Sequence, residues 1–233
     1  MIAAASDLKF ALDEAVVVFR KDQDMQVKVT YGSSGSLFAQ IDNGAPFDLF
    51  LSADAKFPRL LINNGKAEKE SLFQYARGHL VLWVPHSSRL DIDGSGLKSL
   101  FDASVRKIAI ANPDVAPYGT AAVAAMKSAG VYGAVRGKLV LGENVAQAAQ
   151  FIESGAAEVG IIALSLALAP NLKDKGRFWE VPPDTFPPLE QAGVIRSGSA
   201  QREAATKLRE FLMSEAGREV LRRYGFLLPD DNR

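Results

Sequence analysis

Small and hydroxylated residues occupy four positions where a predicted strand runs directly into a predicted helix. The four junctions are Ala5-Ser6-Asp7, Gly32-Ser33-Ser34-Gly35, Ala116-Pro117-Tyr118-Gly119 and Glu143-Asn144-Val145. A helix N-terminus presents backbone N–H groups that lack intrahelical partners, and it carries a partial positive charge of roughly half a unit. Such an end can hold an anion without lysine or arginine. Four of them facing one cleft predict a site for a divalent anion.

Each junction also has a simpler interpretation, because Ser, Asp and Asn are ordinary helix caps. The pair Ser33 and Ser34 is the strongest candidate, since the glycines on either side let the backbone approach a ligand closely. The same residues would also suit a flexible turn. Tyr118 is compatible with a lone surface aromatic. A carboxylate of Asp7 aimed at the ligand would repel a dianion but accept a proton from monohydrogen phosphate, whereas a first-turn acid needs no functional role.

Catalytic motifs find no support in this sequence. His79 and His86 lie in and just after an apolar run, and neither has a proposed partner. The G-x-S-x-G and H-E-x-x-H patterns are missing, as are the phosphate-loop and dinucleotide fingerprints. We therefore expect a binding protein and not an enzyme, with no cofactor and no bare metal ion.

The amino-acid composition limits the kinds of partner that the protein could bind. Lys+Arg and Asp+Glu both total 27, so no basic surface for nucleic acid is indicated. Cysteine is absent, which excludes disulfides and thiolate metal sites. No apolar run of about 18 residues predicts a membrane span. The first residues lack a secretory signal, so an exported protein would be present here in its mature form.

Short apolar runs alternate with segments of helical period, which is typical of an α/β fold. The predicted strands are residues 2–5, 27–31, 47–51, 79–84, 107–111, 138–141, 159–163 and 192–195. The predicted helices are a first one through Leu8, Leu12 and Phe19, then residues 37–43, 119–129, 145–154 and 201–223. In an open α/β sheet ligands bind at the carboxyl edge of the strands, where the four junctions would lie.

Several segments resemble the periplasmic molybdate-binding proteins of ABC importers. The resemblance is carried by Ala3-Ala4-Ala5-Ser6, by Gly44-Ala45-Pro46-Phe47-Asp48-Leu49-Phe50-Leu51-Ser52-Ala53-Asp54, by the loop from Asn112-Pro113 to Gly119, and by Arg223-Tyr224-Gly225-Phe226. The Gly44 to Asp54 block is the most specific of these, and the similarity extends along the whole chain.

The resemblance implies a two-lobed type II periplasmic-binding-protein fold, in which each lobe is a mixed sheet flanked by helices. Lobe I would comprise residues 1–78 and 196–233, and lobe II residues 79–195, with the ligand cleft between them. Two crossover segments, near residues 78–84 and 192–196, would act as hinges when the lobes close on the ligand.

The resemblance also implies the ligand donors. They would be the hydroxyls of Ser6 and Ser34, the backbone at Tyr118 and at Val145, and at most the backbone N–H of Asp7. Some family members add a tyrosine hydroxyl where this chain has Ala163, which leaves a fifth contact open. A site that contains only hydrogen-bond donors suits a fully deprotonated tetrahedral dianion such as molybdate or tungstate. A protonated anion would need an acceptor for its proton, and such a site has none.

The implied protein is a periplasmic monomer that delivers molybdate or tungstate to an ABC transporter permease with its ATPase. Two alternatives stay open at this point. One is a binder of sulfate, phosphate or a small organic anion, and the other is a cytoplasmic effector-sensing domain of a regulator built on the same fold.

Overall fold

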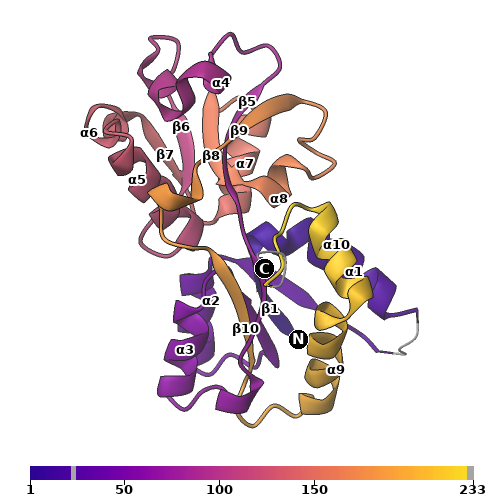
Figure 1. Ribbon diagram of the computed structural model, residues 1–233. Helices are drawn as coiled ribbons and strands as arrows, with labels where there is room; N and C mark the ends of the chain where they lie inside the picture. The colour runs from indigo at the N-terminus through magenta and orange to yellow at the C-terminus, as the bar shows by residue number, and fades with distance from the viewer. Residues whose placement is uncertain (22–24, 230–233) are drawn as a thin grey trace. The chain divides into compact units, whose positions relative to one another are not determined.

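A computed structural model of the chain, which describes residues 1–21 and 25–229, divides into two α/β lobes. Lobe I comprises Met1–Gly78 and the chain from Leu189 onward, and lobe II comprises His79–Pro188 (Figure 1). The expected first boundary, after residue 78, agrees with this division. The expected second boundary, after residue 195, does not. Residues 190–195 form a strand within the lobe I sheet. Lobe II therefore ends at residue 188 and not at residue 195, seven residues earlier than the apolar run indicated.

Lobe I contains a five-stranded mixed sheet in the order β2-β1-β3-β10-β4. Its strands are β1 (Ile2–Ala5), β2 (Val29–Gly32), β3 (Leu49–Ser52), β4 (Phe73–Arg77) and β10 (Glu190–Ile195). Strands β1, β2 and β3 are parallel, whereas β10 runs antiparallel to both β3 and β4. The carboxyl ends of β1, β2 and β3 therefore meet at one edge, and the junctions that follow them lie together there.

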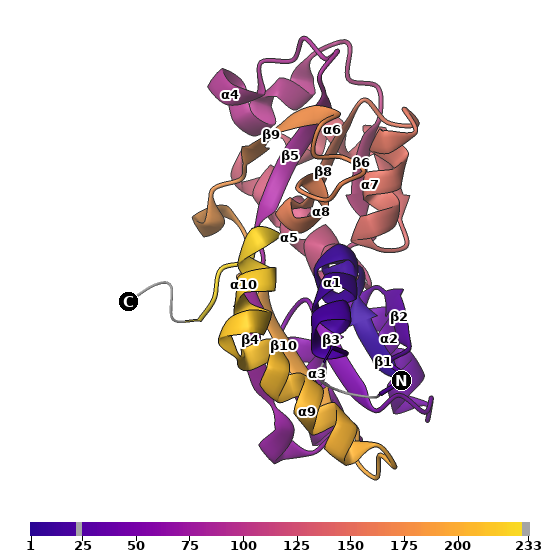
Figure 2. The same cartoon turned by 90° about the vertical axis from the view of Figure 1, so that its right-hand side faces the viewer.

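Helices cover both faces of the lobe I sheet, because successive residues of a strand point to opposite faces. Ile2 and Ala4 pack with α1 (Lys9–Phe19), α9 (Arg202–Met213) and α10 (Glu215–Arg223) in one core cluster. Ala3 belongs to a second cluster with α2 (Ser34–Asp42) and α3 (Lys56–Asn63). In Figure 2 the first group of helices, α1, α9 and α10, faces the viewer. A short 3-10 helix, η1 (Ser6–Leu8), joins β1 to α1.

Lobe II contains a second five-stranded sheet, in the order β7-β6-β8-β5-β9. Its strands are β5 (Leu80–Pro85), β6 (Ile108–Ala111), β7 (Leu139–Gly142), β8 (Val159–Ala163) and β9 (Gly176–Glu180). Strand β6 is parallel to β7 and β8, while β5 is antiparallel to β8 and β9. The longer helices α5 (Pro117–Ser128) and α7 (Val145–Glu153) begin at the carboxyl edge of the parallel strands. Shorter helices are α4 (Ile92–Ser95), α6 (Tyr132–Val135) and α8 (Leu164–Ala167).

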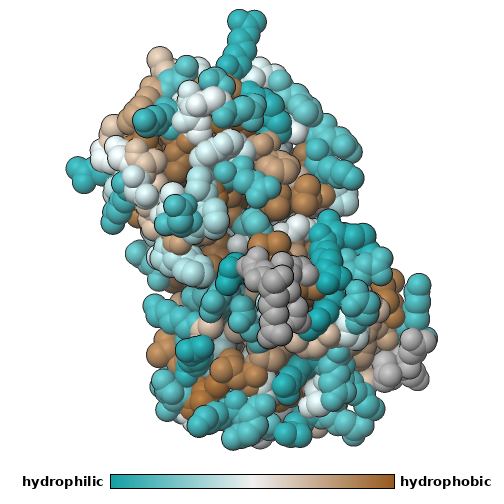
Figure 3. Space-filling model, in the orientation of Figure 1, coloured by the Kyte–Doolittle hydropathy of each residue, from teal (hydrophilic) through white to brown (hydrophobic). Residues whose placement is uncertain are grey.

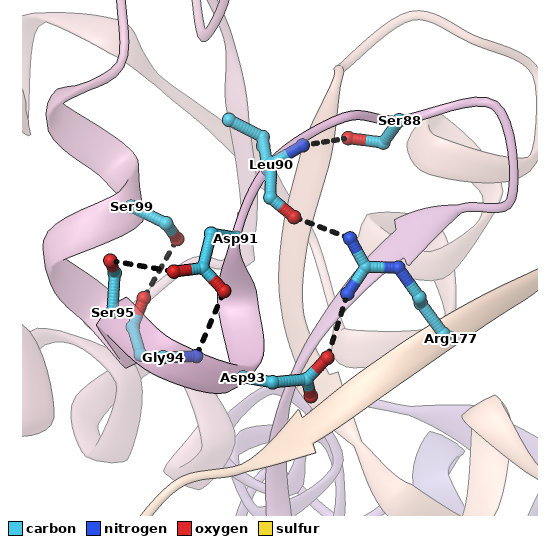
Figure 4. Close-up of polar contacts among 9 residues, drawn as sticks. Ser88, Leu90, Asp91, Asp93, Gly94, Ser95, Ser99 and Arg177 are labelled. Atoms are coloured by element: carbon cyan, nitrogen blue, oxygen red, sulfur yellow. Dashed lines mark hydrogen bonds and ion pairs between the residues drawn. The ribbon is translucent and has the colours of Figure 1, made fainter.

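Polar contacts anchor the segment around α4 to the edge strand β9 (Figure 4). The Asp91 side chain caps α4 by accepting the Gly94 N–H at 2.9 Å. From β9, Arg177 pairs with Asp93 at 3.2 Å and also donates to the Leu90 carbonyl. Strand β9 was not expected from the sequence, because its residues are only partly buried and show no strong apolar run.

Two helix boundaries differ from those predicted from the sequence, and in both cases a serine side chain caps the helix start. Helix α2 begins at Ser34, three residues before the predicted start at 37, because Ser33 serves as its N-cap. The predicted helix 201–223 is two helices that break at Ser214, whose side chain caps α10. A Cβ at Gly217 would lie 2.2 Å from the Phe211 carbonyl oxygen, so the turn is compact enough to require glycine.

The surfaces of both lobes carry interspersed hydrophilic and hydrophobic residues on the face shown in Figure 3. Within residues 1–21 and 25–229, no helix is long and apolar enough to cross a bilayer. The same residues contain no group of three or more His, Cys, Asp or Glu side chains that could hold a metal ion.

Candidate anion-binding site

Ser6 and Ser34 lie at the same edge of the lobe I sheet. Ala5 of β1 is in register with Gly32 of β2, so the residues that follow these two parallel strands emerge side by side. Ser6 opens η1 and is 3% exposed, while Ser34 opens α2 and is 1% exposed. Two serine side chains predicted from separate junctions are therefore brought together and are both buried.

The two adjacent serines of the second junction have different roles. Ser33 is the helix cap, because its Oγ accepts the Ser36 N–H at 3.3 Å and donates to the Ser36 Oγ at 2.7 Å. The Ser34 Oγ instead accepts the backbone N–H of Ala53 at 3.0 Å. A hydroxyl has one hydrogen to donate and two lone pairs, so this bond leaves its hydrogen available. No acceptor for that hydrogen is found within the described residues.

Asp7 points its carboxylate into the interior of lobe I. Its Oδ2 accepts the Nε2–H of Gln191 at 2.6 Å, and the Oε1 of Gln191 accepts the hydroxyl of Tyr75 at 3.0 Å. Burial above all, and then the negative charges of Asp7 and Asp54, raise the pKa of Tyr75 well above its ordinary value. The phenol thus remains protonated and can act as a donor.

At the start of α7 in lobe II, the residue that caps the helix is likewise different from the residue predicted to bind the ligand. The Asn144 side chain accepts the N–H groups of Ala146 and Gln147 at 3.0 and 3.1 Å. The Gln147 side chain reaches back and accepts the Glu143 N–H at 2.7 Å. The N–H of Val145 is not engaged by this cap, and it is the donor that the helix N-terminus can direct at an anion.

The start of α5 holds Tyr118 at its second position. Pro117 has no N–H, and the N–H groups of Gly119 and Thr120 bond to the Ala116 carbonyl at 2.9 and 3.1 Å. Tyr118 is 2% exposed, so the interpretation as a surface aromatic is wrong. Because Ala111 of β6 is in register with Gly142 of β7, the starts of α5 and α7 share one edge of the lobe II sheet.

The predicted residues therefore form two groups, Ser6, Asp7 and Ser34 in lobe I and Tyr118 and Val145 in lobe II. None of the five is cationic, and their hydroxyl and N–H groups can only offer hydrogen bonds and helix-end partial charge to an anion. The Oδ2 of the Asp7 carboxylate accepts from Gln191, and binding of a ligand by the Asp7 backbone stays a prediction. Ala163 ends β8 fully buried and offers no hydroxyl.

Sequence reasoning missed three residues that support the lobe I group. The backbone N–H of Ala53 donates to the Ser34 hydroxyl. Ala53 lies in the block from 44 to 54, which the sequence marks only through its resemblance to a known family. Gln191 is a polar residue just before an apolar run, and this position is the only local signal for it in the sequence. Tyr75 lies in β4, a strand that the sequence pattern did not predict.

Each of the two α/β lobes has parallel strands that run directly into helix starts at one edge of its sheet, which is the architecture of a solute-binding protein. The chain belongs to the bacterial extracellular solute-binding protein family, whose model matches residues 1–227.

Relatives with assigned ligands are similar over nearly the whole chain. The molybdate-binding protein ModA of Rhodobacter capsulatus is 36% identical over 225 residues, which are 97% of this chain and 86% of that protein. The periplasmic molybdate-binding protein of Azotobacter vinelandii superposes with a TM-score of 0.90 at 33% identity, covering 98% of both chains. The sulfate-binding protein SubI of Mycobacterium tuberculosis shares the fold, with a TM-score of 0.78 and 16% identity over 99% of this chain and 86% of that one.

Proposed function

We propose that this protein captures molybdate or tungstate outside the cytoplasm and delivers it to the permease and ATPase of an ABC importer. The observation that carries the proposal is the chemistry of the five candidate residues, which supply hydroxyl and N–H donors at buried helix starts and no cationic side chain. The identity of 36% to a molybdate-binding protein over almost the whole chain supports the choice of anion.

The ligand would be bound by donors from both lobes. Ser6 and Ser34 would donate hydroxyl hydrogens from lobe I, and the backbone at Tyr118 and Val145 would donate N–H groups from lobe II. A dianion that lacks protons can accept from all of these groups at once. Closure of the lobes over it would remove water and strengthen each bond, since electrostatic interactions are stronger at low dielectric.

The protein would act as a periplasmic monomer without enzymatic activity. Its partner would be the permease, which would bind the loaded protein after the lobes have closed. Molybdate and tungstate carry the same charge, so donors of this type do not separate them, and we propose both as ligands.

Calorimetric titration of the purified protein with molybdate, tungstate, sulfate and phosphate tests the proposal. We expect molybdate and tungstate to bind tightly and to compete for one site, and sulfate and phosphate to bind far more weakly. Tighter binding of sulfate or phosphate would overturn the proposed ligand.

A further inference from the structure

A chain of buried side chains lies behind the Ser6–Asp7 turn and links it to the strand on which the polypeptide returns to lobe I. Gln191 of β10 is fully buried and donates to Asp7 at 2.6 Å, although the two residues are 184 positions apart in the sequence. The single hydroxyl hydrogen of Tyr75 in β4 has two acceptors, the Gln191 Oε1 and the Ser52 carbonyl, each 3.0 Å from the phenol oxygen. Three strands and the first turn of the chain are thus connected by polar contacts.

An irregularity in the sheet accompanies this chain of contacts. Gln191 pairs with Ala76 and Ala192 pairs with Gln74, so Tyr75 is an additional residue on β4. A β-bulge of this kind changes the direction of a side chain and is common next to functional sites. Here Tyr75 and Gln191 both reach the same buried polar cluster as Asp7.

The orientation of the Gln191 amide follows from its two neighbours. A carboxylate can only accept hydrogen bonds, so the NH₂ end of the amide must face Asp7. The carbonyl end then faces the protonated phenol of Tyr75, which donates to it. Both ends of the amide are satisfied, and the rotation of Asp7 is restrained.

The carboxylate of Asp7 is the one acceptor-only side chain among the five candidate ligand residues. Turned toward the ligand, it would repel a dianion and would favour an anion that carries a proton. With its Oδ2 bonded to Gln191, the buried carboxylate is held within lobe I, and the turn can offer Ser6 and its backbone donors instead.

We infer that Gln191 is a positioning and specificity-determining residue of the anion site, which fixes the Ser6–Asp7 turn and withholds the Asp7 carboxylate from the ligand. This inference rests on the proposed function for the identity of the anion. The hydrogen bonds that carry it belong to lobe I alone.

The test compares Gln191→Ala with Gln74→Ala, a matched control in which an exposed glutamine of the neighbouring strand is removed. We expect Gln191→Ala to weaken molybdate binding about tenfold or more, the scale of one lost hydrogen bond to a charged group, and to lower the ratio of molybdate to phosphate affinity. Hydrogen exchange of residues 1–12 in the anion-free protein should become faster in Gln191→Ala and stay unchanged in Gln74→Ala.

Swapping the acid and the amide between positions 7 and 191 distinguishes a positioning role of Gln191 from a general loss of stability. It also tests the inference if Gln191→Ala does not fold. Gln191→Glu places two carboxylates against each other, so its anion affinity should fall as the pH rises from about 6 to about 8, when both ionise. Tyr75 and Asp54 are the other titratable groups that face this cluster. The double variant Asp7→Asn/Gln191→Glu restores one donor and one acceptor, and it should recover most of the lost affinity and the wild-type pH profile.

The inference is overturned if Gln191→Ala matches Gln74→Ala in affinity ratio and in exchange, or if the double variant binds no better than Gln191→Glu. Failure of the proposed function would be seen separately, as a wild-type protein that prefers another anion. The exchange rates and the recovery by the double variant would still report on Gln191 in that case, with the preferred anion as the titrant.

Discussion

Ser33 and Ser34 show how two neighbouring residues of one type can have different functions. Ser33 satisfies the helix start, and Ser34 receives the Ala53 N–H and so directs its own hydrogen elsewhere. Capping and ligand binding were alternatives in the sequence, and the structure shows capping for one serine while the other keeps a hydrogen to donate. The role of Ser34 in binding stays a prediction.

Ser34→Ala should weaken molybdate binding by about 1.5–3 kcal/mol, because a hydrogen bond to a charged ligand is lost in a buried site. This corresponds to a factor of roughly 10 to 150 in the dissociation constant measured by calorimetry. Ser36→Ala, which removes an exposed hydroxyl from the same helix turn, is the control and should bind nearly as the wild type does. Equal affinities of the two variants would remove Ser34 from the site.

At the level of elements, the helix starts depend on close contact between helix and strand. A Cβ at Gly119, in the first turn of α5, would lie 2.3 Å from the carbonyl oxygen of Ala111 at the end of β6. A Cβ at Gly142, at the end of β7, would lie 2.7 Å from the Ala148 N. Both glycines let a helix N-terminus lie directly against the strand edge where the predicted donors Tyr118 and Val145 are located.

Gly119→Ala should therefore displace the start of α5 and destabilise lobe II by about 1–3 kcal/mol, the range for overpacking of a tight contact. We also expect weaker molybdate binding, because the backbone at Tyr118 moves with the helix. Gly133→Ala is the matched control, since nothing lies within 4 Å of a Cβ there and the residue is helical. Urea unfolding and titration would measure both effects, and a Gly119→Ala protein as stable as Gly133→Ala would show that the contact relaxes without cost.

At the level of the whole molecule, the proposed function predicts that one anion bound by donors from both lobes stabilises both of them. Each lobe has its own sheet and its own core, and the polypeptide passes between them at residues 78/79 and 188/189. A ligand that binds only the folded state adds stability in proportion to the logarithm of its concentration. Stability measured with and without molybdate is thus a property of the whole chain.

Molybdate at about one hundred times its dissociation constant should add about 2.7 kcal/mol of stability. For a chain of this length that corresponds to a rise of roughly 5–11 °C in the unfolding temperature measured by scanning calorimetry. Sulfate at the same concentration should give a much smaller rise, and removing molybdate by dialysis should reverse the effect. A rise as large with sulfate as with molybdate would contradict the proposed selectivity.

The sequence by itself determined the features that depend on near neighbours. The alternation of strands and helices, the mixed α/β class, and the junctions at Ser6, Ser34, Tyr118 and Val145 all follow from periodicity and helix-start chemistry within a few residues. Helix α7 and strands β1 and β8 agree with prediction to within a residue for this reason.

Only the tertiary structure decided the features that depend on distant segments meeting. The membership of β10 in lobe I, the bulge at Tyr75 and the bond between Asp7 and Gln191 join parts of the chain that no local pattern relates. A run of apolar residues shows that a strand is buried, because burial requires apolar side chains, but it does not show which neighbour the strand pairs with. Every residue except proline offers the same backbone donor and acceptor, so strand pairing is settled by how the whole lobe packs.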